Sequence, residues 1–265
     1  MNLQPLYTLD NCKAAYQCRW SLSIFPKQTL PQPGNWLGPL NEALRPDNVR
    51  VLEAFQQANQ SLLFLLSTTP SVAPPQIVRV VKGRLQHLLR SEFPVEYRRN
   101  FRLTSVGDAN LATVEAYVAK QAEHHQLADP RSQQLMTEFQ LTFPDVDLAE
   151  PLNSAHGQYV TALHIVLVHA ERWRTAEPTF HTITRDAILS AASKKAHRLS
   201  RLSIVADHVH FTLRIGYEMS PAVVALSYMN NIAFRHGMLR MWMESFYVGT
   251  IGAYDMEAVR RRLLK

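Results

Sequence analysis

The segment Phe101–Asp108 (FRLTSVGD) returns in weakened form as Phe246–Ala253 (FYVGTIGA). Both copies mix apolar and polar residues and reach a glycine near their end, so each predicts a strand that stops at a turn. The copies lie about 145 residues apart, a spacing that indicates a duplicated domain rather than a solenoid of short repeats. The fold is therefore expected to consist of two related halves.

Two further matches keep nearly the same offset. Ala15–Phe25 (AYQCRWSLSIF) matches Gln158–Val168 (QYVTALHIVLV), and both predict an opening strand. Pro75–Lys82 (PQIVRVVK) matches Pro221–Tyr228 (PAVVALSY), and both predict a helix with proline in its first turn. Each half is expected to run strand, helix, strand, helix, strand, helix, which is an α+β plan of the ferredoxin-like type.

The predicted fold class is α+β, with two tandem ferredoxin-like domains, each an antiparallel sheet with helices on one face. We expect residues 1–128 to form the first half and residues 154–265 to form the second. The polar residues 129–153 predict a linker with a short helix within residues 131–142. Pro26–Pro46 contains five prolines and predicts a loop insertion in the first half.

Composition sets broad limits on the class of protein. Hydrophobic residues make up 46% of the chain, enough for a substantial core, but no apolar run approaches the roughly 18 residues that span a bilayer. The first residues lack the pattern of a signal peptide, and two cysteines, Cys12 and Cys18, are too few for a disulfide framework. A cytoplasmic protein is expected, and its net charge of +6 favours a polyanionic partner.

Ala206–Leu213 (ADHVHFTL) alternates imidazoles with apolar residues and predicts a strand. His208 and His210 then point to the same face, where two neutral imidazoles can hold one divalent cation. The same pattern occurs in cupins, amidohydrolases and ordinary strands. Asp207 is expected either to orient one of these histidines or to cap a turn.

Several other enzyme classes are excluded. The sequence contains no glycine-rich phosphate loop, no Cys-x-x-Cys pair, no Gly-x-Ser-x-Gly elbow and no zinc-protease helix.

Taken in order, these motifs resemble those of the single-tyrosine HUH transposases, the small single-strand transposases of insertion sequences and their repeat-associated relatives. That family has a strand with His-x-His, a helix with Lys-Gly-Arg, a (Ser/Thr)-Val-Gly turn and a helix with Tyr-x-x-x-Gln. This chain divides the motifs between its halves. The first half has Lys82-Gly83-Arg84, Ser105-Val106-Gly107 and Tyr117 to Gln121; the second has His208 to His210 and Thr250-Ile251-Gly252.

The losses in the two halves are complementary. In the first half the histidine positions fall on Gln60–Leu62, and in the second half the tyrosine position falls on Arg262. Members of the family are dimers in which histidines of one subunit meet the tyrosine helix of the other. The resemblance therefore implies an intramolecular pseudo-dimer with one complete composite site.

The resemblance also implies roles for the site residues. Tyr117 is expected to attack DNA and form a 5′-phosphotyrosine intermediate. Gln121, one helical turn from Tyr117, is expected to join His208 and His210 as a ligand of Mg²⁺ or Mn²⁺. On the residues alone, Tyr117 also fits a packed helix tyrosine with Gln121 in solvent. His124 and His125 are expected to be exposed or to face DNA, with His125 a substitute ligand.

A predicted helix carries a basic set that is expected to hold the phosphates of single-stranded DNA with hairpins, such as element ends or repeats. Its members are Lys82, Arg84, Arg79 and Arg90. A solvated helix face is the simpler interpretation of the same residues. The expected function is a single-stranded DNA transposase that nicks and rejoins strands. One alternative is a domesticated DNA-binding protein without catalysis, and another is a metal enzyme of a different class built around His208 and His210.

Overall fold

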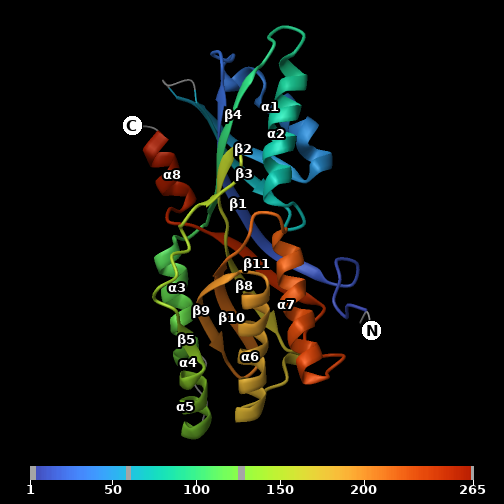
Figure 1. The fold of residues 1–265 in the computed structure, drawn as a ribbon, viewed down its shortest axis with the longest axis vertical. Coiled ribbons are helices and arrows are strands. Elements are labelled where there is room, and N and C mark those ends of the chain that lie inside the picture. Colours follow the sequence, from blue (N-terminus) through green and yellow to red (C-terminus); the bar gives the residue numbers. More distant parts are fainter. Residues whose placement is uncertain (1–3, 58–60, 125–128, 264–265) are drawn as a thin grey trace.

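The structure is a computed structural model, and it describes residues 4–57, 61–124 and 129–263. These residues form an elongated molecule in which one mixed sheet of eleven strands runs through the middle (Figure 1). Helices lie on both sides of the sheet, rather than on one face as the sequence predicted. None of the described helices is both long and apolar enough to cross a membrane.

The elements follow one order in both halves. The first half contains β1 (Lys13–Pro26), α1 (Leu37–Leu44), β2 (Val49–Gln56), β3 (Leu62–Thr68), α2 (Pro74–Leu89), β4 (Tyr97–Val106) and α3 (Leu111–Ala119), with short 3₁₀ turns at Pro33–Asn35 and Arg45–Asp47. The second half contains β8 (Ala162–Val168), a 3₁₀ turn at Ala170–Arg172, α6 (Pro178–Lys194), β9 (Arg198–Ile204), β10 (His208–Arg214), α7 (Pro221–His236), β11 (Ser245–Ile251) and α8 (Met256–Leu263). Between them lie α4 (Gln121–His124), α5 (Pro130–Glu138), β5 (Gln140–Thr142), β6 (Leu152–Asn153) and β7 (Gly157–Val160).

Strand order is also shared. Neighbouring strands run β2-β3-β1-β4 in the first half and β9-β10-β8-β11 in the second. Each half thus has four strands, whereas the sequence predicted three, because a hairpin stands where one strand was expected. Only residues 205–207 separate β9 from β10, and they contain neither the glycine nor the proline that usually marks a hairpin turn.

The sheet is mixed because two parallel pairings join the halves. Lys13–Gln17 of β1 pairs with Ser245–Gly249 of β11, and Phe101–Thr104 of β4 pairs with Gly157–Val160 of β7. After residue 17, β1 turns to its own half and pairs with β3 and β4. The four strands of each half pair in antiparallel fashion, as predicted. The prediction of two separate sheets is wrong, since a pairing between distant strands leaves no mark in the local pattern of either one.

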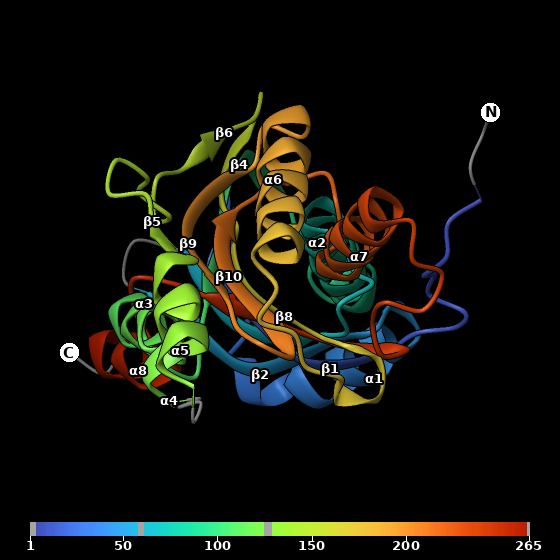
Figure 2. The ribbon, with the colours of Figure 1, turned by 90° about the horizontal axis from the view of Figure 1, so that it is seen from below.

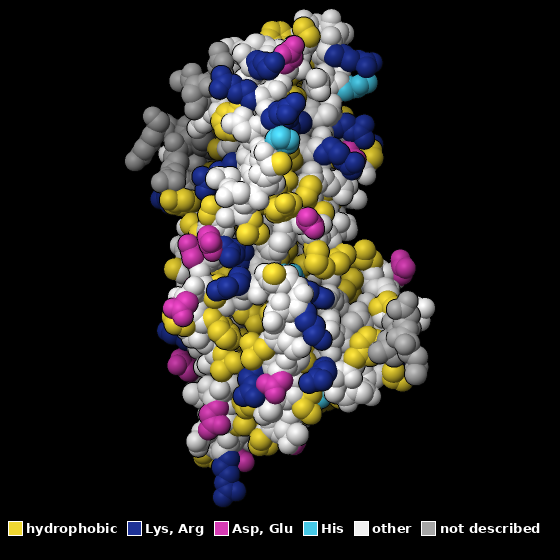
Figure 3. Space-filling model, in the orientation of Figure 1, with side chains coloured by type: hydrophobic (Ala, Val, Ile, Leu, Met, Phe, Trp, Pro, Cys, Tyr) yellow, Lys and Arg dark blue, Asp and Glu magenta, His cyan; other side chains and the backbone are white. Residues whose placement is uncertain are grey.

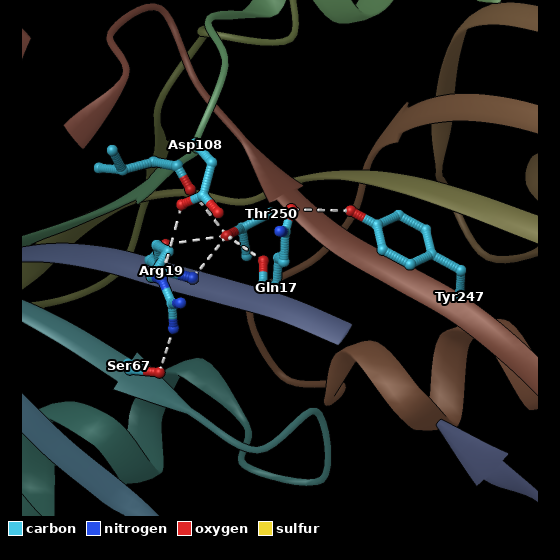
Figure 4. A network of polar contacts seen from close by, with 7 residues as sticks. Gln17, Arg19, Ser67, Asp108, Tyr247 and Thr250 are labelled. Atoms are coloured by element: carbon cyan, nitrogen blue, oxygen red, sulfur yellow. Dashed lines mark hydrogen bonds and ion pairs between the residues drawn. The ribbon is translucent and has the colours of Figure 1, made fainter. Parts of the chain in front are cut away.

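Two hydroxyl groups brace this junction in a reciprocal way. Ser105 donates from Oγ to the carbonyl of Ile251 at 2.7 Å and accepts the N–H of Ala162 at 3.1 Å. Thr250 Oγ1 lies 2.7 Å from the carbonyl of Val106 and accepts the N–H of Arg19 at 2.7 Å (Figure 4). The (Ser/Thr)-x-Gly turns of the two halves thus hold each other's backbone.

Apolar residues cover one face of each half-sheet. Val209, Phe211 and Leu213 of β10 are fully buried in the core beneath α6 and α7, and Trp20 and Leu22 of β1 are fully buried beneath α1 and α2. Every second residue therefore points away from this core toward the opposite face.

The expected loop at residues 26–46 contains a helix. Within it, Trp36, Leu40 and Leu44 are spaced four residues apart, and all three are buried against the first half-sheet. A stripe at this spacing lies along one helix face, which explains why α1 forms in spite of the prolines around it.

The last helix of each half crosses to the other half. After β4, α3 packs on β9 and β10, and after β11, Met256 of α8 packs with Leu65 and Val106 (Figures 1 and 2). The turns before these helices leave no room for a side chain: a Cβ on Gly107 would collide with the carbonyl of Ala109 in the same turn, and one on Gly252 with the carbonyl of Ser105 in the other half. Only glycine fits at these two turns.

The segment around residues 129–153, for which a linker was expected, contains two elements that contact the second half. Leu135 of α5 belongs to the second core, and β5 pairs with β9 over Gln140–Thr142. Tyr117 and Gln121, expected one turn apart on a helix, lie on α3 and α4, since the backbone of Lys120 between these helices is not helical. His125 lies in the range 125–128, outside the described residues.

Candidate active site

The polar face of β10 is directed toward α3, the helix that carries Tyr117. In β10, Val209 and Phe211 enter the second core, so His208, His210 and Thr212 point to the opposite face, where α3 lies. All three of these polar residues are buried.

Tyr117 reaches this face from α3. The helix starts at Asn110, whose side chain accepts the N–H of Thr113 at 2.9 Å and so caps the first turn. The Tyr117 ring lies 5.6 Å from the His210 ring, nearly perpendicular to it, and 48% of the residue is exposed. The structure thus brings together a tyrosine of the first half and a histidine of the second.

His164 of β8 is a third residue of this group, and the sequence reasoning missed it. Its Nε2 lies 3.1 Å from Nδ1 of His210, and the two rings stack 5.4 Å apart. Burial lowers its pKa to about 4, so the ring is neutral at neutral pH. The available signal was a single polar residue within the apolar run Ala162–Val168, but the strand register was needed to place it opposite Thr212, beside His210.

Asp207 contacts His208. Its Oδ1 lies 2.6 Å from Nδ1 of His208, and its Oδ2 forms an ion pair with Arg172 at 3.7 Å. Asp207 and His164 therefore each engage the Nδ1 atom of one histidine of the His-x-His pair, which fixes the orientation of both rings.

Gln121 starts α4 and is buried beneath it. Its Nε2 donates to the carbonyl of Tyr117 at 3.0 Å, and its Oε1 has no hydrogen-bond partner among the described residues. The amide makes no hydrogen bond with His208 or His210 in the described part of the chain. Its buried, unpartnered Oε1 is the atom that the expected role as a metal ligand requires, and that role stays a prediction.

The donor set fits a divalent cation that accepts oxygen and nitrogen ligands. Besides Gln121 Oε1, the hydroxyls of Ser203 and Thr212 are buried without a partner among the described residues. Ser203 stands opposite His210 in the sheet. Within residues 4–57, 61–124 and 129–263, no three His, Cys, Asp or Glu side chains are placed to hold a metal. A cation here needs amide, hydroxyl or DNA oxygens in addition to imidazole.

A hollow of about 470 Å³ opens beside these residues. It is lined by Thr113, Val114, Tyr117, His164, Val166, His210 and Tyr247, among others. Tyr247 donates from its hydroxyl to Oε1 of Gln17 at 3.2 Å, and burial raises the pKa of this phenol (Figure 4). Of the two tyrosines at the hollow, Tyr117 is the more exposed.

The basic set of α2 lies away from this hollow. The apolar residues of α2 pack on the first core, so the helix covers the opposite face of the sheet from α8 (Figure 1). Arg79, Arg84 and Arg90 are exposed, and Arg84 forms an ion pair with Asp47 at 3.0 Å. Lys82 is half-buried over the Tyr97 ring, and burial lowers its pKa. Lys and Arg gather over this end of the molecule, where acidic side chains are sparse (Figure 3).

Comparison with known protein families finds one match, in the second half of the chain. Residues 158–262 match the family described as "Transposase IS200 like", so this segment is similar to the IS200-like transposases. The matched segment holds β8, β10 and β11, which carry His164, His208, His210 and Tyr247.

Two solved structures are similar to the chain at low identity. One is described as a REP-associated tyrosine transposase bound to a REP hairpin; it is 13% identical, with a TM-score of 0.31, over 39% of this chain and 61% of that chain. The other is an unknown protein from Galdieria sulphuraria; it is 7% identical, with a TM-score of 0.21, over 89% and 97% of the two chains. No curated protein matches the chain.

Proposed function

We propose that this protein nicks and rejoins single-stranded DNA at one composite active site. The observation that carries the proposal is the approach of Tyr117, on a helix that leaves the first half, to His210 and His164 of the second half. An exposed phenol beside buried imidazoles is the arrangement that a tyrosine nucleophile requires. The family match supports the transposase class.

In the proposed reaction, Tyr117 Oη attacks the phosphorus of a phosphodiester. A bond forms between Oη and phosphorus, and the bond from phosphorus to the 3′ oxygen breaks. The phenol gives up its proton, and the leaving 3′ oxygen gains one and becomes a hydroxyl. The products are a 5′-phosphotyrosine and a free 3′ end. Attack by a 3′ hydroxyl on the phosphotyrosine reverses the step, so no nucleotide is consumed.

The remaining residues position the reacting groups. Asp207 and His164 hold the rings of His208 and His210, and α3 holds Tyr117 over them. These two histidines and Gln121 are the proposed ligands of Mg²⁺ or Mn²⁺, which when bound draws charge from the scissile phosphate. Gln121 would serve through Oε1, which is buried without a hydrogen-bond partner among the described residues while Nε2 donates to the Tyr117 carbonyl.

The exchange of α3 and α8 supports a pseudo-dimer within one chain. Each half has the same strand order, and each sends its last helix onto the other half. We infer that residues 1–128 and 154–265 correspond to two fused ferredoxin-like units. The strand register places Ser61 and Leu63 at the positions of His208 and His210, one residue later than the expected Gln60–Leu62. The first half therefore lacks the histidines, and one site per chain is left.

The substrate proposed is single-stranded DNA with a hairpin. The exposed arginines of α2 are proposed to hold its phosphates, together with Lys82. Because α2 lies far from Tyr117, the hairpin stem and the cleaved strand occupy different parts of the surface in this proposal.

The test is covalent capture of DNA by the intact chain. Single-stranded oligonucleotides with hairpins, taken from the DNA that flanks the coding sequence, carry a label at the 3′ end, since that fragment stays on the protein. With Mg²⁺ or Mn²⁺, a labelled adduct that survives denaturation is expected. Tyr117→Phe abolishes it and keeps binding, while Tyr16→Phe, at a similarly exposed tyrosine, retains it. Hairpin binding without any adduct would favour the alternative of a DNA-binding protein without catalysis.

A further inference from the structure

A second hollow of about 330 Å³ lies on the first half, in the place that corresponds to the candidate active site. Val259 of α8 lines it as Val114 of α3 lines the first hollow. On the sheet, Ser21 pairs with Thr104 of β4 as His164 pairs with Gly249 of β11. The two hollows therefore occupy matching positions under the two exchanged helices.

The floor of the second hollow carries a group of polar side chains. Ser21 stands directly opposite Thr104, and Ser23 stands directly opposite Arg102, so four polar side chains share one face of two adjacent strands. Arg102 is exposed, and within the described residues its guanidinium has no ion pair or hydrogen bond. The three hydroxyls also lack hydrogen-bond partners there. Three hydroxyls and one guanidinium form a donor set suited to phosphate oxygens.

The polar row continues beyond the hollow. Arg102 pairs with Gln158 of β7, and Gln158 donates to the side chain of Asn153 at 3.1 Å. A neighbouring hollow of about 560 Å³, lined by Arg99, Arg102 and His156 among others, shares Arg102 with the first. Two neighbouring hollows that share an arginine offer space for more than one nucleotide.

The second hollow lacks the histidine side chains of the first. Leu63 occupies the position of His210, and Ser21 occupies the position of His164. Arg262 stands at the tyrosine position of α8, and its side chain lies outside the described part of the chain. A phosphodiester held here therefore meets donors but no imidazole pair.

We propose that this hollow is a second binding site for the phosphodiester backbone of single-stranded DNA, one that binds without cleaving. It extends the proposed function, because it would hold a further stretch of strand while Tyr117 acts on another. The proposed second site is tested by equilibrium binding of DNA, which involves no covalent step. The result of this test is therefore independent of whether the protein cleaves DNA.

The experiment measures the anisotropy of fluorescein-labelled dT₁₂ with the full chain at several salt concentrations. Arg102→Gln is expected to weaken binding about tenfold at low salt and to reduce the slope of log K against log salt by roughly 0.7, the value for one lost contact with a single strand. Arg240→Gln, which removes the same charge from an exposed arginine near the end of α7, is expected to change binding less than twofold.

A second variant tests the hollow rather than the charge. Ser23→Leu fills the floor beside Leu63 and is expected to weaken dT₁₂ binding at least fivefold at unchanged net charge. If that variant does not fold, Thr104→Val removes one hydroxyl at similar size, with an expected loss of about twofold to threefold. Two results together would overturn the proposal. Arg102→Gln would bind dT₁₂ with the same affinity as Arg240→Gln, and the folded Ser23 or Thr104 variant would bind it with the affinity of the wild type.

Discussion

The Tyr117 ring lies 5.6 Å from the ring of His210, although the two residues belong to different halves of the chain. The contact exists because α3 leaves the first half at Gly107 and packs on β9 and β10. His210 is buried at this contact and Tyr117 is half exposed, so a strand of DNA can approach the phenol from the side of the hollow.

His164 is expected to act by positioning His210. His164→Phe keeps an aromatic ring in the stack and removes the nitrogen that lies 3.1 Å from His210 Nδ1. Adduct formation at limiting Mn²⁺ should fall roughly 10-fold to 100-fold, as for other residues that orient a metal ligand. Excess Mn²⁺ should recover part of the loss. The midpoint of a Mn²⁺ titration is the measurement, and an unchanged midpoint would exclude this role.

Thr250→Val is expected to destabilise the fold. The change leaves the buried N–H of Arg19 without its acceptor and costs about 1–3 kcal/mol of unfolding free energy. Thr212→Val is the matched control: its hydroxyl is buried but has no partner among the described residues, so the change should cost less than about 0.5 kcal/mol. Urea unfolding of both variants checks the difference. An equal loss of unfolding free energy in the two variants would show that the hydrogen bonds of the Thr250 hydroxyl do not stabilise the fold.

Gly83→Ala separates stability from DNA binding. A Cβ at residue 83 meets nothing within 4 Å, so packing does not require glycine there. Alanine in the interior of α2 should raise the free energy of unfolding by about 0.5–1 kcal/mol. If DNA approaches the helix backbone at this point, as the Lys-Gly-Arg motif implies, hairpin affinity should fall at the same time. A variant that is more stable and binds hairpins normally would place the DNA elsewhere.

His197 should make stability depend on pH. Burial lowers its pKa to about 4, and its Nδ1 lies 3.1 Å from the Tyr228 hydroxyl. In the unfolded chain the imidazole takes up a proton near pH 6.5, whereas in the folded chain it stays neutral down to about pH 4. The folded state therefore keeps its full stability above pH 6.5 and loses stability as the pH falls from 6.5 toward 4. The loss at pH 5 is about 2 kcal/mol for this residue.

Urea unfolding at pH 7 and pH 5 measures the effect. The wild-type chain should lose more stability over this interval than His197→Asn, whereas His87→Asn, at an exposed histidine of α2, should lose as much as the wild type. A His197 variant with the full wild-type pH dependence would contradict the assignment.

Local patterns in the sequence predicted much of what the structure contains. The strand at His208, the helices after Pro74 and Pro221, and the glycine turns at residues 107 and 252 follow from periodicity and turn chemistry. The pairing of β1 with β11 could not be predicted in this way, because the two strands are more than two hundred residues apart. The local pattern of each segment predicts a strand but does not identify its partner.

The candidate site was also predictable only in part, because local motifs mark some of its residues and strand pairing brings in the others. Tyr117, His208 and His210 stand in motifs, and the structure places Tyr117 against His210. His164 stands in no motif, and only the register of β8 against β10 shows that it shares their face. The orientation of the Gln121 amide depends on the break after Ala119, which a helical spacing of four residues does not reveal.

The parallel pairing of β1 with β11 has a consequence for synthesis. During synthesis, β1 cannot pair with β11 and α3 cannot pack on β9 and β10 until those strands have been made. The sheet is therefore completed only after residue 249 has left the ribosome. A chain that stops before residue 208 carries Tyr117, the proposed nucleophile, without the two histidines proposed to act with it. The proposed composite site therefore requires that both halves have been synthesised.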